Sequence, residues 1–159
     1  MVEMKFLTDR MLGKLTTWLR ISGYDTVSIA DLNVGGDEDE FMLSNLRERI
    51  LLTKDKTLYR KCLKEGRKAF LIKSNDIVGQ MKELMSLGVK FQLVMDRCSV
   101  CNSELRKPSR DEALEVICRE GLSEDMLDFE LWYCEKCKKL YWMGGHWRNM
   151  SRFLRRVEE

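Results

Sequence analysis

The sequence predicts an α/β fold, in which a parallel sheet covered by helices is followed by a small metal-binding module. Short apolar runs that suit buried strands alternate with amphipathic stretches that suit helices, and this alternation is typical of parallel sheets. Toward the end of the chain stand two C-x-x-C pairs, which have the spacing of a zinc ribbon. We therefore expect one domain over residues 1–95, and a zinc ribbon with an insertion and a C-terminal helix over residues 96–159.

The composition of the 159 residues excludes several classes of protein. Hydrophobic residues make up 44%, which supports a packed core. The formal net charge is only +2, so nucleic-acid binding would have to come from local basic patches. No apolar run approaches the roughly 18 residues of a membrane-spanning helix, and the first residues lack the apolar core of a signal peptide. We expect a cytoplasmic protein that does not associate with membranes.

Strand and helix signals follow one another regularly in the first domain. After the first strand, Leu12, Leu15 and Leu19 are spaced to share one helix face, and Gly23 is a typical helix end. In order, the expected elements are strand 5–9, the helix before Gly23, strand 25–29, a loop over 33–36, helix 37–48, strand 50–53, helix 57–65, strand 69–72, helix 76–87 and strand 89–94.

The strand at residues 50–53 is the expected centre of the sheet. Three consecutive aliphatic residues with no polar alternation suit a strand that is buried on both faces. The run ends abruptly at Asp55, and the first strand ends in the same way at Asp9. In open α/β sheets, ligands bind just beyond the carboxyl ends of the strands. Both carboxylates should therefore lie at the edge of the sheet where a ligand would bind.

Four aspartates should meet at this edge. Asp9 and Asp55 follow strands, Asp37 opens a helix, and Asp76 follows the fourth strand. Carboxylates brought together repel one another, and hard ions such as Mg²⁺ or Mn²⁺ are the usual partners that neutralise them. A pair of such ions can activate water for phosphodiester cleavage. For Asp37, Asp55 and Asp76 the alternative is a helix N-cap, which is even with the functional role for Asp55 and favoured for Asp76.

Basic side chains next to the acids could form the wall of a binding site. Lys14 and Arg20 lie away from the leucine face of the first helix. They are interpreted either as part of a basic wall beside the acidic site or as a solvated helix face. A Ser/His/Asp arrangement is not available, because the single histidine, His146, belongs to the second module.

Two C-x-x-C pairs are the strongest single signal in the sequence. Four thiolates satisfy tetrahedral Zn²⁺ and leave no open position, which is typical of a structural site. A redox role would need a thioredoxin-like unit beside one pair. Cys62 and Cys118 are interpreted as ordinary thiols. The expected zinc ligands are Cys98, Cys101, Cys134 and Cys137.

The last segment reads as an amphipathic helix that starts near His146. Its apolar side would carry Trp147, Met150, Leu154 and Val157, and its basic side Arg148, Arg152 and Arg155. Aromatic stacking combined with arginine contacts to phosphate is a common way of holding single-stranded RNA. The alternatives are aromatic residues that pack the small zinc core, arginines that are merely solvated, and a structural hydrogen-bonding role for His146.

Several motifs together resemble one known family. They are Leu12-Gly13-Lys14-Leu15, Trp18-Leu19-Arg20, Gly23-Tyr24-Asp25-Thr26, Leu51-Leu52-Thr53-Lys54-Asp55, and the paired cysteines with Tyr141-Trp142-x-Gly-x-His146. In this order they are similar to the PIN-like RNase domain named from the C terminus of the Mut-seven proteins, and they span almost the whole chain. The resemblance implies a PIN-like parallel-sheet sandwich and a metal-dependent ribonuclease.

The resemblance also implies which acids hold the metal. The family acids carry over onto Asp9, Asp37 and Asp55, while Asp39 and Glu40 are close enough to take the place of Asp37. The expected function is an endoribonuclease that hydrolyses phosphodiester bonds in RNA, with single-stranded RNA as the partner and the zinc ribbon aiding binding. The rival hypotheses are a non-catalytic zinc-ribbon adaptor for RNA or protein, a ribosomal-RNA processing factor, and a nuclease that cleaves DNA.

Overall fold

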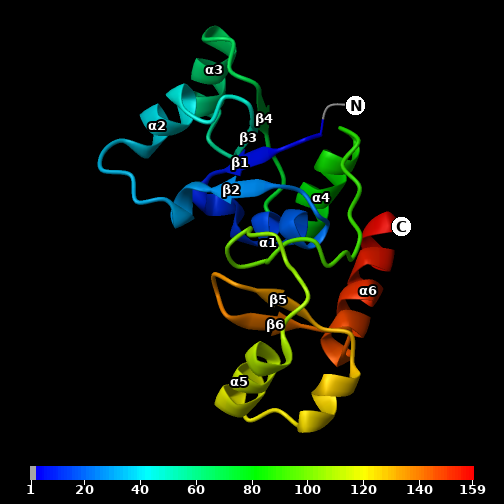
Figure 1. Cartoon of the computed structure of the whole chain (residues 1–159). Coiled ribbons are helices and arrows are strands. Elements are labelled where there is room, and N and C mark those ends of the chain that lie inside the picture. The colour runs from blue at the N-terminus through cyan, green and yellow to red at the C-terminus, as the bar shows by residue number, and fades with distance from the viewer. Residues whose placement is uncertain (1–2) are drawn as a thin grey trace.

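A four-stranded parallel sheet forms the first body of the protein, as the computed structural model of residues 3–159 shows (Figure 1). The strand order is β2-β1-β3-β4, so the two strands that end in aspartate lie side by side at the centre. The predicted α/β class and its parallel sheet are confirmed. The strands are β1 (Phe6–Thr8), β2 (Thr26–Ser28), β3 (Ile50–Thr53) and β4 (Ala69–Leu71).

Helices cover both faces of this sheet, because consecutive residues of a strand point to opposite sides. Phe6 and Leu52 pack with α1 (Gly13–Ile21) and α4 (Ile77–Met85). Leu7 and Leu51 pack on the other side with α2 (Glu38–Ser44) and α3 (Lys56–Lys64). All four of these strand residues are fully buried, which explains why the central strands show no polar alternation.

The connections leave the two central strands in opposite directions. From β1 the chain passes through α1 to β2 on one side, and from β3 it passes through α3 to β4 on the other. Neighbouring strands whose connections diverge in this way leave a crevice beyond their carboxyl ends, where ligands of open α/β sheets bind. Asp9 and Asp55 follow the two strands that form this crevice.

Helix α2 ends earlier than predicted, at Ser44 rather than near residue 48. Leu46 adopts a positive φ of 53°, which an α-helix cannot contain. The buried guanidinium of Arg67 donates to the carbonyl oxygens of Met42, Leu46 and Arg49 and thereby holds this turn. The partner that ends the helix comes from a distant segment, which local sequence does not reveal.

The strand predicted at residues 89–94 is wrong. This segment is irregular, although Val89 and Phe91 are buried in the core. Two of its backbone N–H groups bond to side chains instead of a neighbouring strand: Lys90 donates to the hydroxyl of Tyr24 and Gln92 donates to Oγ of Ser22.

The second body is built on a short antiparallel hairpin of β5 (Trp132–Cys134) and β6 (Lys139–Tyr141). The insertion between the cysteine pairs contains α5 (Arg110–Glu120) and a 3-10 turn, η3 (Glu124–Asp128). α5 opens with a reciprocal capping box between Ser109 and Glu112. Its apolar face packs on the hairpin through Val116, Ile117 and Leu140.

Helix α6 (Gly145–Glu158) leaves this hairpin and packs against the first body (Figure 1). Leu154 and Val157 belong to the same buried cluster as Phe6. Phe153 stacks on Trp18 of α1 with ring centroids 5.1 Å apart. The predicted division assigned this helix to residues 96–159, whereas its apolar face completes the core of the first body. None of the helices described in residues 3–159 is long and apolar enough to cross a membrane.

Candidate active site and cysteine cluster

Asp9 is held rigidly at the end of β1. Its side chain is 7% exposed. Oδ2 accepts hydrogen bonds from Thr53 Oγ1 at 2.7 Å and from the backbone N–H of Lys54 at 2.9 Å. Oδ1 accepts from the backbone N–H of Met11 at 2.9 Å, which starts the 3-10 turn η1 (Arg10–Leu12). Asp9 thus joins the carboxyl ends of β1 and β3, and the importance of Thr53 and Lys54 was not predicted.

Asp55 caps α3 and lies just beyond the carboxyl end of β3. Oδ1 accepts from the N–H groups of Thr57 and Leu58 at 2.8 and 3.2 Å, so it caps α3. Its own backbone N–H donates to Oγ1 of Thr53 at 3.0 Å. Within residues 3–159, no hydrogen bond to Oδ2 of Asp55 is found. The cap uses one carboxylate oxygen and leaves the other available to a ligand.

The third acid has two candidates in the first turn of α2. Asp37 is exposed, and its Oδ1 caps the helix by accepting from the N–H groups of Asp39 and Glu40. Asp39 is half-buried, and burial together with the negative charges of Asp55, Asp37 and Asp9 raises the pKa of its carboxyl group. Asp39 therefore lies within the electrostatic field of the two central acids.

The first turn of α2 is fastened to the end of β1 by an ion pair. Arg10 Nε lies 2.8 Å from Glu38 Oε1, and Arg10 Nη2 lies 2.7 Å from Glu38 Oε2. This fork geometry lowers the pKa of Glu38. The sequence pattern did not suggest this pair, because the residues are 28 positions apart. It brings the acids of α2 toward the crevice.

Asp76 and Glu40 contact residues other than the two central acids, Asp9 and Asp55. Asp76 Oδ2 caps α4 by accepting from the N–H of Gly79 at 3.0 Å. Glu40 is exposed and lies against Ser44. Lys54 points away from the acids, since its Nζ donates to the carbonyl oxygen of Ser74 at 2.8 Å.

The side chain of Arg20 is buried, so it is not available for the RNA contact considered above. Its side chain is 4% exposed. Nε donates to the carbonyl oxygen of Thr26, Nη1 to that of Val100, and Nη2 to Oδ2 of Asp31, each at 2.9 Å. The arginine thus joins the sheet to the first cysteine loop. The remaining candidates, Lys14, Arg148, Arg152 and Arg155, are exposed.

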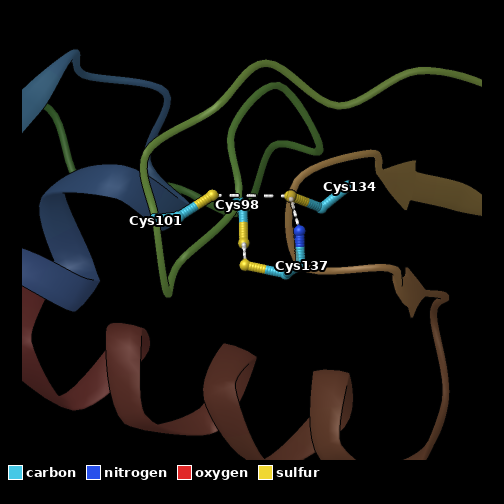
Figure 2. A group of neighbouring side chains, drawn as sticks. All are labelled: Cys98, Cys101, Cys134 and Cys137. Atoms are coloured by element: carbon cyan, nitrogen blue, oxygen red, sulfur yellow. Dashed lines mark hydrogen bonds between the residues drawn. The ribbon is translucent and has the colours of Figure 1, made fainter.

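The four predicted cysteines converge, as Figure 2 shows. All four sulfur atoms lie within 4.8 Å of one another. The Sγ atoms of Cys98 and Cys137 lie 3.9 Å apart, and those of Cys101 and Cys134 lie 3.4 Å apart. A tetrahedral zinc ion with bonds of about 2.3 Å would separate its sulfur ligands by about 3.8 Å. The cluster therefore fits zinc, and it could hold the ion without any other ligand.

The two cysteine loops have the same backbone geometry. The residue after each C-x-x-C pair has a positive φ, 74° at Asn102 and 53° at Lys138. The N–H of Cys137 donates to the sulfur of Cys134 at 3.3 Å, as expected when a loop wraps around a metal ligand. Burial opposes ionisation of Cys101, but hydrogen bonding with Ser103 lowers the pKa of its thiol to about 6. A thiolate is thus available for a metal near neutral pH.

The first loop is also attached to the sheet. Oδ1 of Asn102 accepts from the N–H of Thr26 at 2.9 Å, and its Nδ2 donates to Oδ1 of Asp25 at 2.8 Å. The cysteine cluster and the sheet are therefore connected by buried polar contacts at Arg20 and Asn102. Sequence reasoning did not identify Asn102, whose partners are 76 and 77 positions away.

The acidic group is more open than the cysteine group. Among residues 3–159, the cysteines are the only group of three or more possible metal ligands whose atoms lie within 4.8 Å of one another. The acids stand at the end of β1, the start of α2 and the start of α3, and those of β1 and α3 are near enough to act on the pKa of Asp39. An ion there would be bound through a wider shell that includes water, as Mg²⁺ commonly is.

Comparison with known proteins gives one match. The family model described as the Mut7-C RNAse domain matches residues 4–154. Neither a search of curated proteins nor a search of solved structures finds a match.

Proposed function

Because the chain belongs to the Mut7-C RNAse domain family, we propose that it is a metal-dependent endoribonuclease whose active site is the acidic crevice at the ends of β1 and β3. The observation that carries this proposal is the junction at Thr53, which contacts both Asp9 and Asp55. This junction lies where the strand connections diverge, which is the usual ligand site of an open α/β sheet.

The chemistry of the donor set favours a hard divalent cation. The candidate ligands Asp9, Asp37, Asp39 and Asp55 all end in carboxylates, and Mg²⁺ and Mn²⁺ prefer oxygen ligands. Burial, together with the negative charges of Asp55, Asp37 and Asp9, raises the pKa of Asp39, so a cation bound beside this carboxylate would be favourable. Asp9 and Asp55 would hold the ion together with Asp37 or Asp39, and the raised pKa favours Asp39. When bound, the ion would supply an activated water and neutralise charge on the phosphate.

The residues of the chain itself position these groups. Thr53 and Lys54 fix the Asp9 carboxylate, so it cannot rotate away when a substrate binds. Asp55 keeps one oxygen on the helix cap and directs the other to the crevice. Arg10 binds Glu38 through Nε and Nη2, so it helps to hold the first turn of α2 in place. The exposed Lys14, on the first turn of α1, is a candidate for a phosphate contact.

A non-catalytic RNA-binding adaptor is the second candidate. The wide spacing of the carboxylates favours it, because the cysteine cluster is the only compact metal site among the residues described. In that case the basic face of α6 would do the binding and the crevice would be inert.

Cleavage of a circular single-stranded RNA tests the proposal. A circle has no ends, so only an endonuclease converts it to a linear product. We expect cleavage with Mn²⁺ or Mg²⁺ by the wild type and none by Asp55→Asn. The matched control is Asp76→Asn, which changes another helix cap in the same way and should keep activity. Binding without cleavage under any divalent ion would instead support the adaptor. A linear substrate and a DNA circle of the same sequence separate exonuclease and DNase activity.

A further inference from the structure

A cavity of about 340 Å³ lies away from the acids, between the end of α1, the β5–β6 hairpin and the first turn of α6. Its size is at the lower end of the ~300–1,000 Å³ that is typical of pockets for small ligands. Three aromatic side chains, Tyr141, Trp142 and Trp147, form much of its wall, together with Ile21 and Met150. The proposed catalysis does not use any of these groups.

The aromatic wall is built by specific contacts. The hydroxyl of Tyr141 lies 3.0 Å from the sulfur of Cys98 and 3.3 Å from Oγ of Ser99, so the ring is anchored to the first cysteine loop. The ring of Trp142 lies against the bare backbone of Gly144, where a Cβ atom would come within 2.7 Å of the indole nitrogen. Glycine is therefore required at this position for the tryptophan to keep its place.

The charge of the lining favours an anionic ligand. Arg97, Lys139 and His146 line the cavity, and no acidic residue does. Arg97 is partly engaged by Asp25, at 3.8 Å, whereas Lys139 and His146 are exposed. A ligand with a flat aromatic part and a phosphate would match both the aromatic and the cationic parts of this wall.

A second hollow lies between the same two helices, α1 and α6. Ile21 of α1 and Met150 of α6 line the first cavity, while Trp18 of α1 and Phe153 of α6 line the second hollow, of about 240 Å³. Lys14 and Ile77, at the starts of α1 and α4, complete this second hollow. The two hollows thus follow the seam between α1 and α6 toward the carboxyl edge of the sheet, where the acids lie.

We propose that the cavity holds one unstacked nucleotide of the single-stranded RNA substrate. Its base lies against Trp142 and Trp147, and its phosphate contacts Lys139 and His146. The rest of the strand follows the seam past Trp18 and Phe153 to the acidic crevice. This inference rests on the proposed ribonuclease function and assigns a separate binding site to the same substrate.

Binding of a short fluorescein-labelled oligo(A) RNA, measured without divalent ions, tests this site. Asp55→Asn serves as the background, so the RNA stays intact. The test variant is Lys139→Gln with Trp147→Leu. The control is Lys107→Gln with Trp132→Leu, which makes the same changes in a different hollow of the zinc module, where Asp128 and Glu130 add negative charge.

We expect the test variant to bind at least about five-fold more weakly, since stacking on an aromatic side chain contributes about 1 kcal/mol or more per base. The dependence of affinity on salt should fall by about 0.7 in logarithmic slope for each lost phosphate contact. The control should bind like the background. Gly144→Ala should weaken binding without removing any charge, because its Cβ displaces Trp142.

Zinc content and thermal midpoint establish that each variant is folded. If Trp147→Leu fails this check, the single variants Lys139→Gln and His146→Gln, both at exposed positions, replace it. Equal affinities for the test and control variants would overturn the inference, and so would a background protein that does not bind RNA. Binding is measured without catalysis. If the test variant binds RNA more weakly than the control but the wild type never cleaves RNA, only the nuclease proposal is contradicted.

Discussion

Thr53 contacts both central acids: its hydroxyl donates to Oδ2 of Asp9 at 2.7 Å and accepts from the backbone N–H of Asp55 at 3.0 Å. One buried side chain therefore sets how the ends of β1 and β3 meet.

Thr53→Val tests the role of this contact. Valine keeps the branched shape but removes the hydroxyl, so Asp9 loses a hydrogen bond of the charged type, which contributes about 1.5–3 kcal/mol. We expect a lower free energy of unfolding in urea and a loss of cleavage larger than the loss of stability explains. Thr53→Ser, which restores the hydroxyl, should recover most activity. A fully active valine variant would show that Asp9 needs no such support.

Asp55→Asn should separate catalysis from stability. Asparagine keeps an oxygen that can cap α3, and it removes negative charge from the crevice. Without divalent ions, we expect the thermal midpoint to stay the same or rise slightly, because repulsion among the acids is relieved. Titration with Mn²⁺ should raise the midpoint of the wild type but not that of the variant. If Asp55→Asn is clearly less stable but cleaves RNA at the wild-type rate, Asp55 acts only as a helix cap.

The raised pKa of Asp39 predicts how the metal-free protein responds to pH. A carboxyl group whose pKa is higher in the folded state stabilises the fold while it is protonated, and this contribution is lost as pH rises through that pKa. Asp39→Asn should therefore be more stable than the wild type at neutral pH and similar to it in acid. Asp37→Asn is the matched control and should show a smaller gain. Unfolding in urea at both pH values measures the difference.

Cleavage assays on the same pair identify the third acid. We expect Asp39→Asn to lose more activity than Asp37→Asn, since the charges of both Asp9 and Asp55 act on Asp39. A larger loss of activity in Asp37→Asn would instead favour Asp9, Asp37 and Asp55, the ligand set that the family resemblance implies.

Cys101→Ser should destabilise the whole chain as well as remove zinc. Asn102, the next residue, binds the backbone of Thr26 and the side chain of Asp25, so disorder in the cysteine loop removes contacts from the sheet. We expect no zinc by elemental analysis and one cooperative thermal transition at a lower temperature. Cys118→Ser, at an exposed position on α5, is the control. An unchanged transition for the first body would show that the two bodies fold independently.

The arginine face of α6 should contribute to RNA affinity through phosphate contacts. Replacing Arg148, Arg152 and Arg155 by alanine should weaken binding and reduce its salt dependence by about 0.7 in logarithmic slope per contact. The control removes three exposed basic residues on the other side of the sheet, namely Arg60, Lys64 and Lys68. Equal affinity and salt slope for the two triple variants would assign the α6 arginines to solvent.

The parts of the molecule with a strong local pattern could be predicted from sequence. The central strands are uniformly apolar because both faces are buried, and each ends in an acid. The spacing of the cysteines reflects the geometry of a four-coordinate ion, so these residues were identified without a structure.

The parts that depend on distant partners could not be predicted. Arg20 has the sequence pattern of a surface residue, but carbonyl groups 79 and 80 positions later bury its guanidinium. Asp37 and Asp39 are neighbours in sequence, but only the structure shows that Asp37 is exposed and Asp39 half-buried. Long-range pairs of this kind leave no periodic signal.

The packing of α6 has a consequence for synthesis on the ribosome. Leu154 and Val157 complete a core that otherwise consists of residues 6–91. A nascent chain that has emerged only as far as β4 still exposes the apolar surface that α6 later covers. The acids would then have been synthesised before α6 completes the core that supports them. We therefore expect the proposed ribonuclease activity to appear only late in translation.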